Sequence, residues 1–535
     1  MAAKIRPLVA GAAIGALSLT LSACGGGSGT HLVREGCIPH PPPAIADGFR
    51  EPEVRVSKDG VLETTLKASY GPVTINGHKY KTLHYEDSVP GPTLVVCPRD
   101  RLIVHLENDL GDTPPAWGPT PPEHHTPLGE GQLTNLHVHG MHVSPRGNSD
   151  NVFLSIPPGK TFTYEYDIPE DHPPGLYWYH PHRHGFVEAQ VYGGMFGAIY
   201  VQGGLDTLPE VRNIPTRTLI FNSLELGKKE DIPSRAESTA PRPPAVVPTA
   251  KSATAKSPYF VNGELKPEID IRPGEVQRWR ILNADDNAII RLALRGSTFY
   301  TLANDGITLD KISPQRTLLI GPAERREVLV QGGPAGSYEL ESEPFMQFQG
   351  GGTPSTSSLV PASTLAVLRS AGSRKHDTLP TQPLATLSDL SGAKIAQRHR
   401  LVYTEKKVKG GFEFLINGKF FDPDRVDEVM KLGEVNEWTL VNKTSEWHSF
   451  HIHINDFQVI SVKANRVPRV SSGPEGVEDV PPGGNNPADT VLMPPRSTVT
   501  MLTRPTAYTG KFVFHCHMLF HEDHGMMGVV RVDPR

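Results

Sequence analysis

The sequence lacks the patterns of a helical or a nucleic-acid-binding protein. Long amphipathic helical periods are hard to find in its 535 residues, whereas 51 glycines and 51 prolines fit many short strands joined by turns. Its 53 Lys and Arg residues are balanced by 58 Asp and Glu residues, and they form no basic block that would favour nucleic acid as a partner. Hydrophobic residues make up 37%, enough for packed cores, and the length suggests two to four domains. We therefore expect an all-β protein of several domains.

The N-terminal apolar stretch, residues 8–21, is short for a membrane-spanning helix. Lys4 and Arg6 precede it, and Leu21-Ser22-Ala23-Cys24 with a run of glycines follows. This arrangement resembles a bacterial lipoprotein signal, which implies removal of residues 1–23 and a lipid anchor on Cys24. Residues 24–50 would then be a tether at the outer face of a bacterial membrane. An ordinary cleaved signal or a transmembrane anchor is the alternative. A twin-arginine pair is absent, so we expect the chain to be exported unfolded.

Cysteine is scarce, with four in the chain. Cys24 has its role in the signal and Cys516 lies among histidines, which leaves Cys37 and Cys97. In an exported protein such a pair suggests a disulfide, which would contribute about 4 kcal/mol by the chain-entropy model. Two free buried thiols are the alternative.

A weak repeat divides the chain. Residues 91–108, 267–283 and 423–442 each read as a strand, a charged turn, a second strand with alternating apolar residues, and an Asn near its end. A unit that returns after roughly 160 residues indicates three similar β-sandwich domains.

From this spacing we predict domain 1 at 51–204, domain 2 at 208–369, a polar connector at 370–397 and domain 3 at 398–535. Two irregular stretches interrupt them. Residues 234–257 form a polar insert in domain 2, and residues 467–488 form a long Pro- and Gly-rich loop in domain 3.

Histidine is more abundant than cysteine and is concentrated in short segments of the chain. Ten of the 23 histidines fall into four short clusters, each of which contains His-x-His. The clusters are His137-Val138-His139, His180-Pro181-His182, His448-Ser449-Phe450-His451-Ile452-His453, and His515-Cys516-His517 with His521. On extended backbone the two histidines of each His-x-His pair project from one face, and imidazole is a good copper ligand.

Two of the clusters show a change of parity. Along a strand, Cys516 points to one face and its neighbours His515 and His517 point to the other. His448 likewise opposes His451 and His453. A thiolate with imidazoles and a distal thioether from Met526 is the ligand set of a blue copper site. We therefore predict that both segments serve two metal sites, one on each face.

These four motifs, HxHG, HxH, HxxHxH and HCHxxxHxxxxM in this order, resemble those of the multicopper oxidases, and the resemblance covers about residue 52 to the C-terminus. It implies three cupredoxin-like Greek-key β-sandwich domains and four copper ions: one type 1, one type 2 and two type 3. Carried over by motif, the type 1 ligands are His448, Cys516 and His521 with Met526 axial, and the type 2 ligands are His137 and His451. The type 3 ligands are His139, His180, His182, His453, His515 and His517.

The resemblance also implies an activity. Electrons from a donor enter at type 1 copper and reduce O2 to water at the trinuclear cluster, between domains 1 and 3. Water formation needs protons, and Glu522 and Asp150 are the candidate catalytic carboxylates that supply them. A surface or supporting salt-bridge role is the alternative for both.

Several neighbouring residues have weaker roles. His142, His184 and His524 lie beside the clusters but outside the motif pattern, so we expect them to support ligands or to face solvent. His124 and His125 are expected to be exposed. Met527 adjoins Met526, so the axial assignment depends on spacing alone.

The electron donor is the least determined feature. Ten methionines are dispersed and form no insert of the kind found in dedicated cuprous oxidases of this family. We take phenols or aromatic amines as the first candidate donors, with Trp447 available to stack on a phenol. Oxidation of Cu(I), Fe(II) or Mn(II), favoured by the carboxylate of Glu446, is the second. A non-catalytic copper-binding or electron-transfer lipoprotein is the third, and it would require a defective trinuclear site. We expect a monomer.

Overall fold

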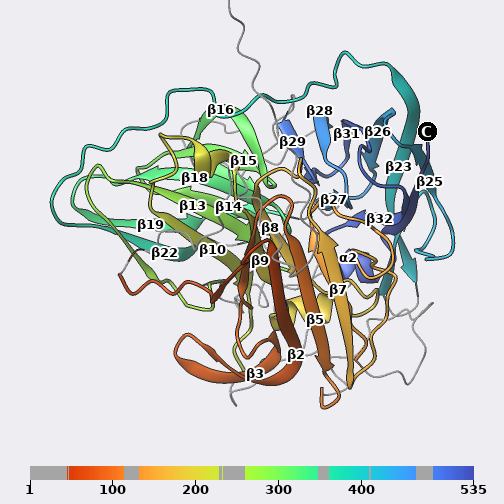
Figure 1. Cartoon of the computed structure of the whole chain (residues 1–535), viewed down its shortest axis with the longest axis horizontal. Coiled ribbons are helices and arrows are strands. Elements are labelled where there is room, and N and C mark those ends of the chain that lie inside the picture. Colours follow the sequence, from red (N-terminus) through yellow and green to blue (C-terminus); the bar gives the residue numbers. More distant parts are fainter. Residues whose placement is uncertain are drawn as a thin grey trace, which may run out of the picture. The chain divides into compact units, whose positions relative to one another are not determined.

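The computed structural model describes residues 45, 47–113, 132–227, 232, 259–347, 359–360, 362–408, 411–464 and 486–535. These residues form almost entirely β-structure, as expected (Figure 1). The predicted signal, Cys24, Cys37, His124, His125, the insert 234–257 and residues 467–485 of the domain 3 loop lie outside them. Cys97 is disulfide-bonded, but its predicted partner Cys37 is among the residues not described.

The first sandwich consists of a five-stranded sheet in the order β1-β4-β9-β8-β6 and a four-stranded sheet in the order β3-β2-β5-β7. The strands are β1 (Val54–Val56), β2 (Val61–Ile75), β3 (His78–Tyr85), β4 (Thr93–Val96), β5 (Arg101–Asp109), β6 (His137–His139), β7 (Lys160–Asp167), β8 (Gly175–His180) and β9 (Gly197–Val201). Helix α1 (Val187–Gly193) joins β8 to β9, and a 3-10 turn, η2 (Gly204–Thr207), follows.

The second sandwich has a sheet in the order β11-β10-β13-β18-β15-β16 and another in the order β12-β22-β19-β14-β17. Its strands are β10 (Thr216–Ser223), β11 (Tyr259–Val261), β12 (Glu268–Ile271), β13 (Val276–Asn283), β14 (Ile290–Leu294), β15 (Phe299–Asn304), β16 (Ile307–Gln315), β17 (Thr317–Ile320), β18 (Arg325–Gln331), β19 (Gly336–Ser342) and β22 (Ser363–Ser370). Two short strands, β20 (Phe345–Met346) and β21 (Leu359–Val360), pair with each other.

The third sandwich has a sheet in the order β24-β23-β26-β31-β28-β29 and another in the order β25-β33-β32-β27-β30. Its strands are β23 (Ile395–Val408), β24 (Gly411–Ile416), β25 (Glu428–Lys431), β26 (Val435–Asn442), β27 (His448–Ile452), β28 (Phe457–Ala464), β29 (Asn486–Ala488), β30 (Thr490–Met493), β31 (Ser497–Thr503), β32 (Gly510–Cys516) and β33 (Met527–Asp533). Helix α2 (Leu519–Asp523) follows β32.

Each sandwich has its own apolar core between its two sheets. In the first, for example, Leu66 and Val104 from one sheet pack into the same cluster as Trp178 and Ile199 from the other. The all-β, three-sandwich fold class predicted from the sequence is confirmed. The domain boundaries given above remain predictions.

The weak sequence repeat has a structural counterpart. Its three copies are β4–β5, β12–β13 and β25–β26, and in each copy the two strands belong to opposite sheets of one sandwich. The repeated Asn is Asn108, Asn283 or Asn442, and each is buried. Its amide donates to two or more loop carbonyls, and its oxygen accepts from the N–H two residues on. In each copy the Asn therefore closes the loop that follows the second strand of the repeat.

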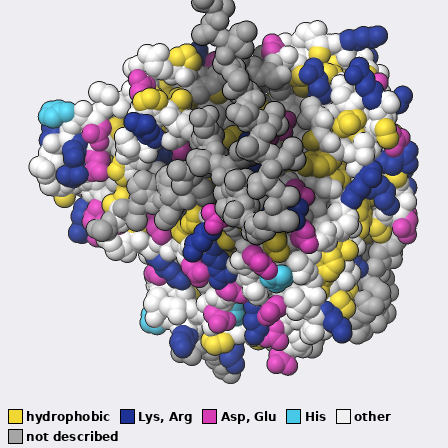
Figure 2. All heavy atoms as spheres, viewed as in Figure 1, with side chains coloured by type: hydrophobic (Ala, Val, Ile, Leu, Met, Phe, Trp, Pro, Cys, Tyr) yellow, Lys and Arg dark blue, Asp and Glu magenta, His cyan; other side chains and the backbone are white. Residues whose placement is uncertain are grey.

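The exposed surface carries both signs of charge. Acidic and basic side chains are intermingled over much of the face in Figure 2, and few histidines appear there. Among the described residues, no helix is both long enough and apolar enough to cross a membrane.

The segment before β1 binds to the second sandwich. Arg217 forms a buried ion pair with Asp47, and Phe49 joins the core of that sandwich. Glu51 accepts hydrogen bonds from the Thr218 N–H at 3.2 and 3.3 Å. Burial raises the pKa of Glu51 to about 7, in spite of that hydrogen bond and of the nearby Arg217.

This raised pKa predicts a pH-dependent stability. The folded state holds the Glu51 proton more tightly than the unfolded chain. The stability that protonated Glu51 contributes is therefore full below about pH 4.5 and is lost as pH rises through about 7. Glu51→Gln should therefore raise the free energy of unfolding at pH 8 by about 1–3 kcal/mol and have little effect at pH 4.5. Chemical denaturation at both pH values measures this. Glu264→Gln, at a more exposed ion pair with Arg50, is the control and should leave the pH dependence unchanged.

Candidate metal centres

One cysteine and two histidines converge in the third sandwich. Cys516 ends β32, His448 begins β27 and His521 lies in α2. The Nδ1 atoms of His448 and His521 are 3.1 Å apart, and each lies 3.5 Å from Cys516 Sγ. All three side chains are fully buried. A sulfur and two nitrogens at the corners of a small triangle match the equatorial ligands of a blue copper site.

The far nitrogen of each imidazole faces a polar side chain. His448 Nε2 lies 2.8 Å from Thr444 Oγ1, and His521 Nε2 lies 3.0 Å from Glu446 Oε2. These contacts direct both Nδ1 atoms toward the sulfur. Burial raises the pKa of the Cys516 thiol to about 12, so a thiolate here needs a cation in contact with the sulfur.

The two candidate axial methionines lie in different clusters. Met526 belongs to the core cluster that contains Cys516, and Met527 packs with Val152 and Phe421 in another. This arrangement favours Met526 over Met527 as the thioether beside the cysteine.

The remaining eight clustered histidines meet between the first and third sandwiches. In the first, β6 and β8 pair antiparallel with His137 opposite His180; in the third, β27 and β32 pair with His451 opposite His515. All eight side chains are buried, with at most 2% exposed. The alternation predicted for the cysteine segment is present, because His515 belongs to this group and Cys516 belongs to the other.

Three of these histidines form a compact triangle. The Nε2 atoms of His182, His453 and His515 lie 3.1, 3.1 and 3.3 Å from one another. Three imidazole nitrogens that face one another at such distances suit a single metal ion.

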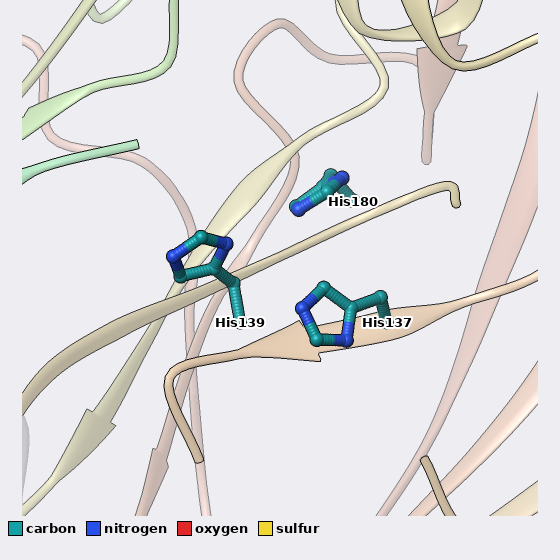
Figure 3. A group of neighbouring side chains, drawn as sticks. All are labelled: His137, His139 and His180. Carbon is teal, nitrogen blue, oxygen red and sulfur yellow. The ribbon is translucent and has the colours of Figure 1, made fainter. Parts of the chain in front are cut away.

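The other five surround the same region. His139, His180 and His517 form a second triangle with ring centroids 5.0–5.7 Å apart. His137 lies 6.1 Å from His451 between ring centroids. Figure 3 shows His137 and His139 rising from one strand, with His180 from the neighbouring segment above them.

The nitrogens of this second set are available as ligands. In these five histidines, six buried ring nitrogens have no hydrogen-bond partner among the described residues: His137 Nε2, His139 Nδ1, His180 Nε2, His451 Nε2 and both nitrogens of His517. Burial first, and neighbouring histidines second, lower the pKa of these imidazoles, to about 3 for His180. Neutral rings with unused nitrogen lone pairs are the form that binds copper, so these residues fit the metal.

Both predicted carboxylates contact this histidine group. Glu522 Oε2 lies 2.8 Å from His515 Nδ1, and Glu522 Oε1 lies 3.5 Å from His182 Nδ1. Asp150 lies 2.9 Å from His137 Nδ1 and accepts from the Val138 N–H at 3.1 Å. Glu522 follows His521 in sequence but faces away from the cysteine site.

The two carboxylates have opposite pKa shifts. Burial raises the pKa of Asp150 to about 8. Burial acts in the same direction on Glu522, but His515 and His182 outweigh it and lower the pKa of Glu522 to about 2. Burial therefore favours the neutral form of Asp150, whereas the neighbouring histidines favour the ionised form of Glu522.

Sequence reasoning placed Trp447 wrongly and missed Asp489. Trp447 is fully buried against Phe345, so it is not available to stack on a phenol. Asp489 lies 3.4 Å from His139 Nε2, and its main-chain oxygen lies 2.8 Å from His451 Nδ1. A lone Asp at the end of an irregular loop gave no signal in the sequence.

The histidines outside the motif pattern lie around the sites. His142 pairs with Asp456 at 3.0 Å, and His184 and His524 are mostly buried. His184 lines a cavity of about 150 Å3 together with the ligand candidate His182 and the apolar side chains of Val152, Val513 and Met527.

Comparisons with known proteins agree with this geometry. Two family models, both described as multicopper oxidase, match residues 130–205 and 391–535. A multicopper oxidase of Staphylococcus haemolyticus is 25% identical over 502 residues, which cover 90% of this chain and 91% of the relative. The chain belongs to the multicopper oxidase family. It is therefore an oxidoreductase that binds copper and uses O2 with a reducing substrate.

Two further relatives are known by their activity. A laccase of Bacillus stratosphericus is 26% identical over 471 residues, covering 83% of this chain and 89% of the relative. The structure of a Campylobacter jejuni multicopper oxidase, described as a metallo-oxidase, matches with a TM-score of 0.68 at 23% identity. It covers 91% of this chain and 96% of that chain, and it supports the fold.

The position of Cys516 predicts the effect of its replacement. Cys516→Ser removes the only thiol of the three-residue group and leaves the eight histidines intact. The copper-loaded variant should lose its blue colour and hold about one copper fewer per chain, as measured by visible absorption and metal analysis. Persistent blue colour would contradict the assignment of this sulfur.

Proposed function

We propose that this protein is a four-copper oxidase that takes electrons singly from a donor and reduces O2 to water. Two buried ligand groups joined through one tripeptide carry the proposal. Cys516 reaches the first group, and its neighbours His515 and His517 reach the second. Copper, when bound, supplies the one-electron centres and the O2-reducing centre.

The ligand sets follow from the two groups. His448, Cys516 and His521 would hold type 1 copper with Met526 axial, and His137 and His451 would hold type 2. His139, His180 and His517 would hold one type 3 copper, and His182, His453 and His515 the other. The 3.1–3.3 Å distances among the Nε2 atoms of His182, His453 and His515 support the last of these sets.

Asp150 and Glu522 are the proposed proton carriers for water formation. The carboxyl of Asp150 lies 2.9 Å from His137 Nδ1, and burial raises its pKa, so it is placed to take up and pass on a proton beside the cluster. Ionised Glu522 accepts from His515 and so fixes the orientation of that ring. The 150 Å3 cavity that reaches His182 supports entry of O2 from this side.

Phenols or aromatic amines are the first candidate donors, as for a laccase, and a laccase is among the relatives. Metal ions are the second, because a carboxylate lies against a type 1 ligand. Glu446 is 5% exposed and lies 3.0 Å from His521 Nε2. Burial first, and the nearby carboxyl of Glu446 second, raise the pKa of Glu405 to about 7. Burial raises the pKa of Glu446 to about 8, and in its ionised form this carboxylate favours a cationic donor.

The location is also proposed from the sequence. The lipobox-like segment ending at Cys24 supports a lipid anchor on the outer side of a bacterial membrane. We propose a monomer, with a small molecule or a metal ion as its donor.

The function is tested on the mature chain expressed with copper. We expect four coppers per chain, a blue colour, and O2 uptake on addition of a donor. A copper-loaded protein without blue colour, or one that consumes no O2 with phenols, Cu(I), Fe(II) or Mn(II), would overturn the proposal.

Replacing Glu446 separates the two donor classes. If metal ions are the donors, Glu446→Gln should lower kcat/KM for them roughly tenfold or more and leave phenol oxidation within about twofold. Equal effects on both donor classes would rule out a role in donor choice. Glu428→Gln is the matched control, since Glu428 also binds a histidine, His399 at 2.7 Å, in a pair that involves no ligand candidate.

Replacing the two inner carboxylates tests proton supply. Asp150→Asn and Glu522→Gln should each lower kcat roughly 10- to 100-fold while the blue colour remains. Stopped-flow reoxidation of the fully reduced variants by O2 locates the defect. An unchanged reoxidation rate and unchanged solvent isotope effect would contradict a proton-transfer role.

A further inference from the structure

Arg325 is a fully buried arginine whose guanidinium contacts all three sandwiches. Its Nε donates to the Leu176 carbonyl of the first sandwich at 3.2 Å, and Nη1 donates to the Ala323 carbonyl of the second at 3.2 Å. Both terminal nitrogens bind Asp489 of the third, at 2.8 Å from Oδ1 and 2.6 Å from Oδ2. Such a two-point contact between a planar guanidinium and a carboxylate fixes both the position and the orientation of the Asp489 side chain.

Asp489 in turn contacts two ligand candidates. Its carbonyl accepts from His451 Nδ1 at 2.8 Å, which leaves His451 Nε2 directed into the histidine group. Its carboxylate lies 3.4 Å from His139 Nε2, and it also accepts from the Thr490 hydroxyl at 2.8 Å. His139 is thereby left with Nδ1 as its unused nitrogen. One aspartate thus sets which nitrogen each ring presents.

The glycine of the first histidine motif accommodates this ion pair. Gly140 has φ +81°, and a Cβ there would lie 2.3 Å from Asp489 Oδ2 and 2.5 Å from Arg325 Nη2. A residue with a side chain at this position would displace the pair. The Arg325–Asp489 pair is therefore packed directly against the strand that carries His137 and His139.

From these contacts we propose that Arg325 is a positioning residue for the type 2 copper. It belongs to the sandwich that supplies no ligand candidate among the described residues, and it acts through Asp489 on the type 2 ligand candidate His451. The second contact of Asp489, with His139, reaches the neighbouring type 3 site. The inference rests on the four-copper function proposed above. Asp489 is not itself assigned as a ligand, because both its oxygens already accept from Arg325 and one also accepts from Thr490.

The test compares copper binding in matched variants of the full chain. Arg325→Gln should lower copper from four toward three per chain and weaken the type 2 signal in electron paramagnetic resonance. The blue type 1 absorption should be unchanged, and kcat should fall roughly 10- to 100-fold. Arg325→Lys, which keeps the charge but not the fork, should restore little of the type 2 signal.

Arg278→Gln is the control for a purely structural role. Arg278 is also buried and binds carboxylates, with Glu327 at 2.7 Å and Asp206 at 2.7 Å, but it contacts no ligand candidate. We expect it to lower the melting temperature and retain all four coppers. Equal copper loss in the Arg278 and Arg325 variants would overturn the proposal.

Asp489→Asn tests the positioning role of the Arg325–Asp489 pair if Arg325→Gln does not fold. Asn keeps the size and the backbone carbonyl but loses the ion pair, so the type 2 hyperfine coupling should change. An unaltered signal with four coppers in this variant would also overturn the proposal. Failure of the unmodified protein to bind four coppers would instead refute the proposed function, so the two failures are distinguishable.

Discussion

The structure depends on burying a large number of imidazole nitrogens without hydrogen-bond partners. Each buried polar atom left unpaired costs about 1–3 kcal/mol, and seven such nitrogens, from His137, His139, His180, His451, His453 and His517, meet between the first and third sandwiches. A bound cation removes this cost, because the same lone pairs become metal ligands. The surrounding contacts are consistent with that use. Asp150, Glu522 and the Asp489 carbonyl each bind the outer nitrogen of a ring, and so the inner nitrogen is the one left over.

Because side chains alternate along a β-strand, the strand that supplies histidines to this cluster also supplies ligand candidates to the cysteine site on its other face. In β32, Cys516 faces His448 and His521, whereas His515 faces His182 and His453. The two groups are therefore separated by the thickness of one strand and joined by its covalent backbone. No extra element is needed to connect them, since adjacent residues of an extended chain point to opposite sides. His448 and His451 in β27 repeat the device on the neighbouring strand.

Local patterns in the sequence predicted the fold class and which histidines face the same side of a strand, because spacing along a strand carries that information. The repeated strand–turn–strand units ending in Asn108, Asn283 and Asn442 predicted three sandwiches for the same reason. Arg325 was not predictable, since its partners lie 149 and 164 residues away and come from other sandwiches. Trp447 was misjudged because proximity in sequence to His448 does not determine burial. Glu522 follows His521 in the sequence, but the turn into α2 directs it to the other metal group, beside His515 and His182.

The binding of the first described residues to the second sandwich has a mechanical consequence. Before the chain enters β1, Asp47 forms an ion pair with Arg217 and Phe49 packs into the core of that sandwich. If the preceding residues are held at a membrane, tension on them is transmitted first to the second sandwich. That sandwich contributes no ligand candidate among the described residues. Strain from the attachment would thus act on the second sandwich before it reached β1 and the strands of the first sandwich that follow it.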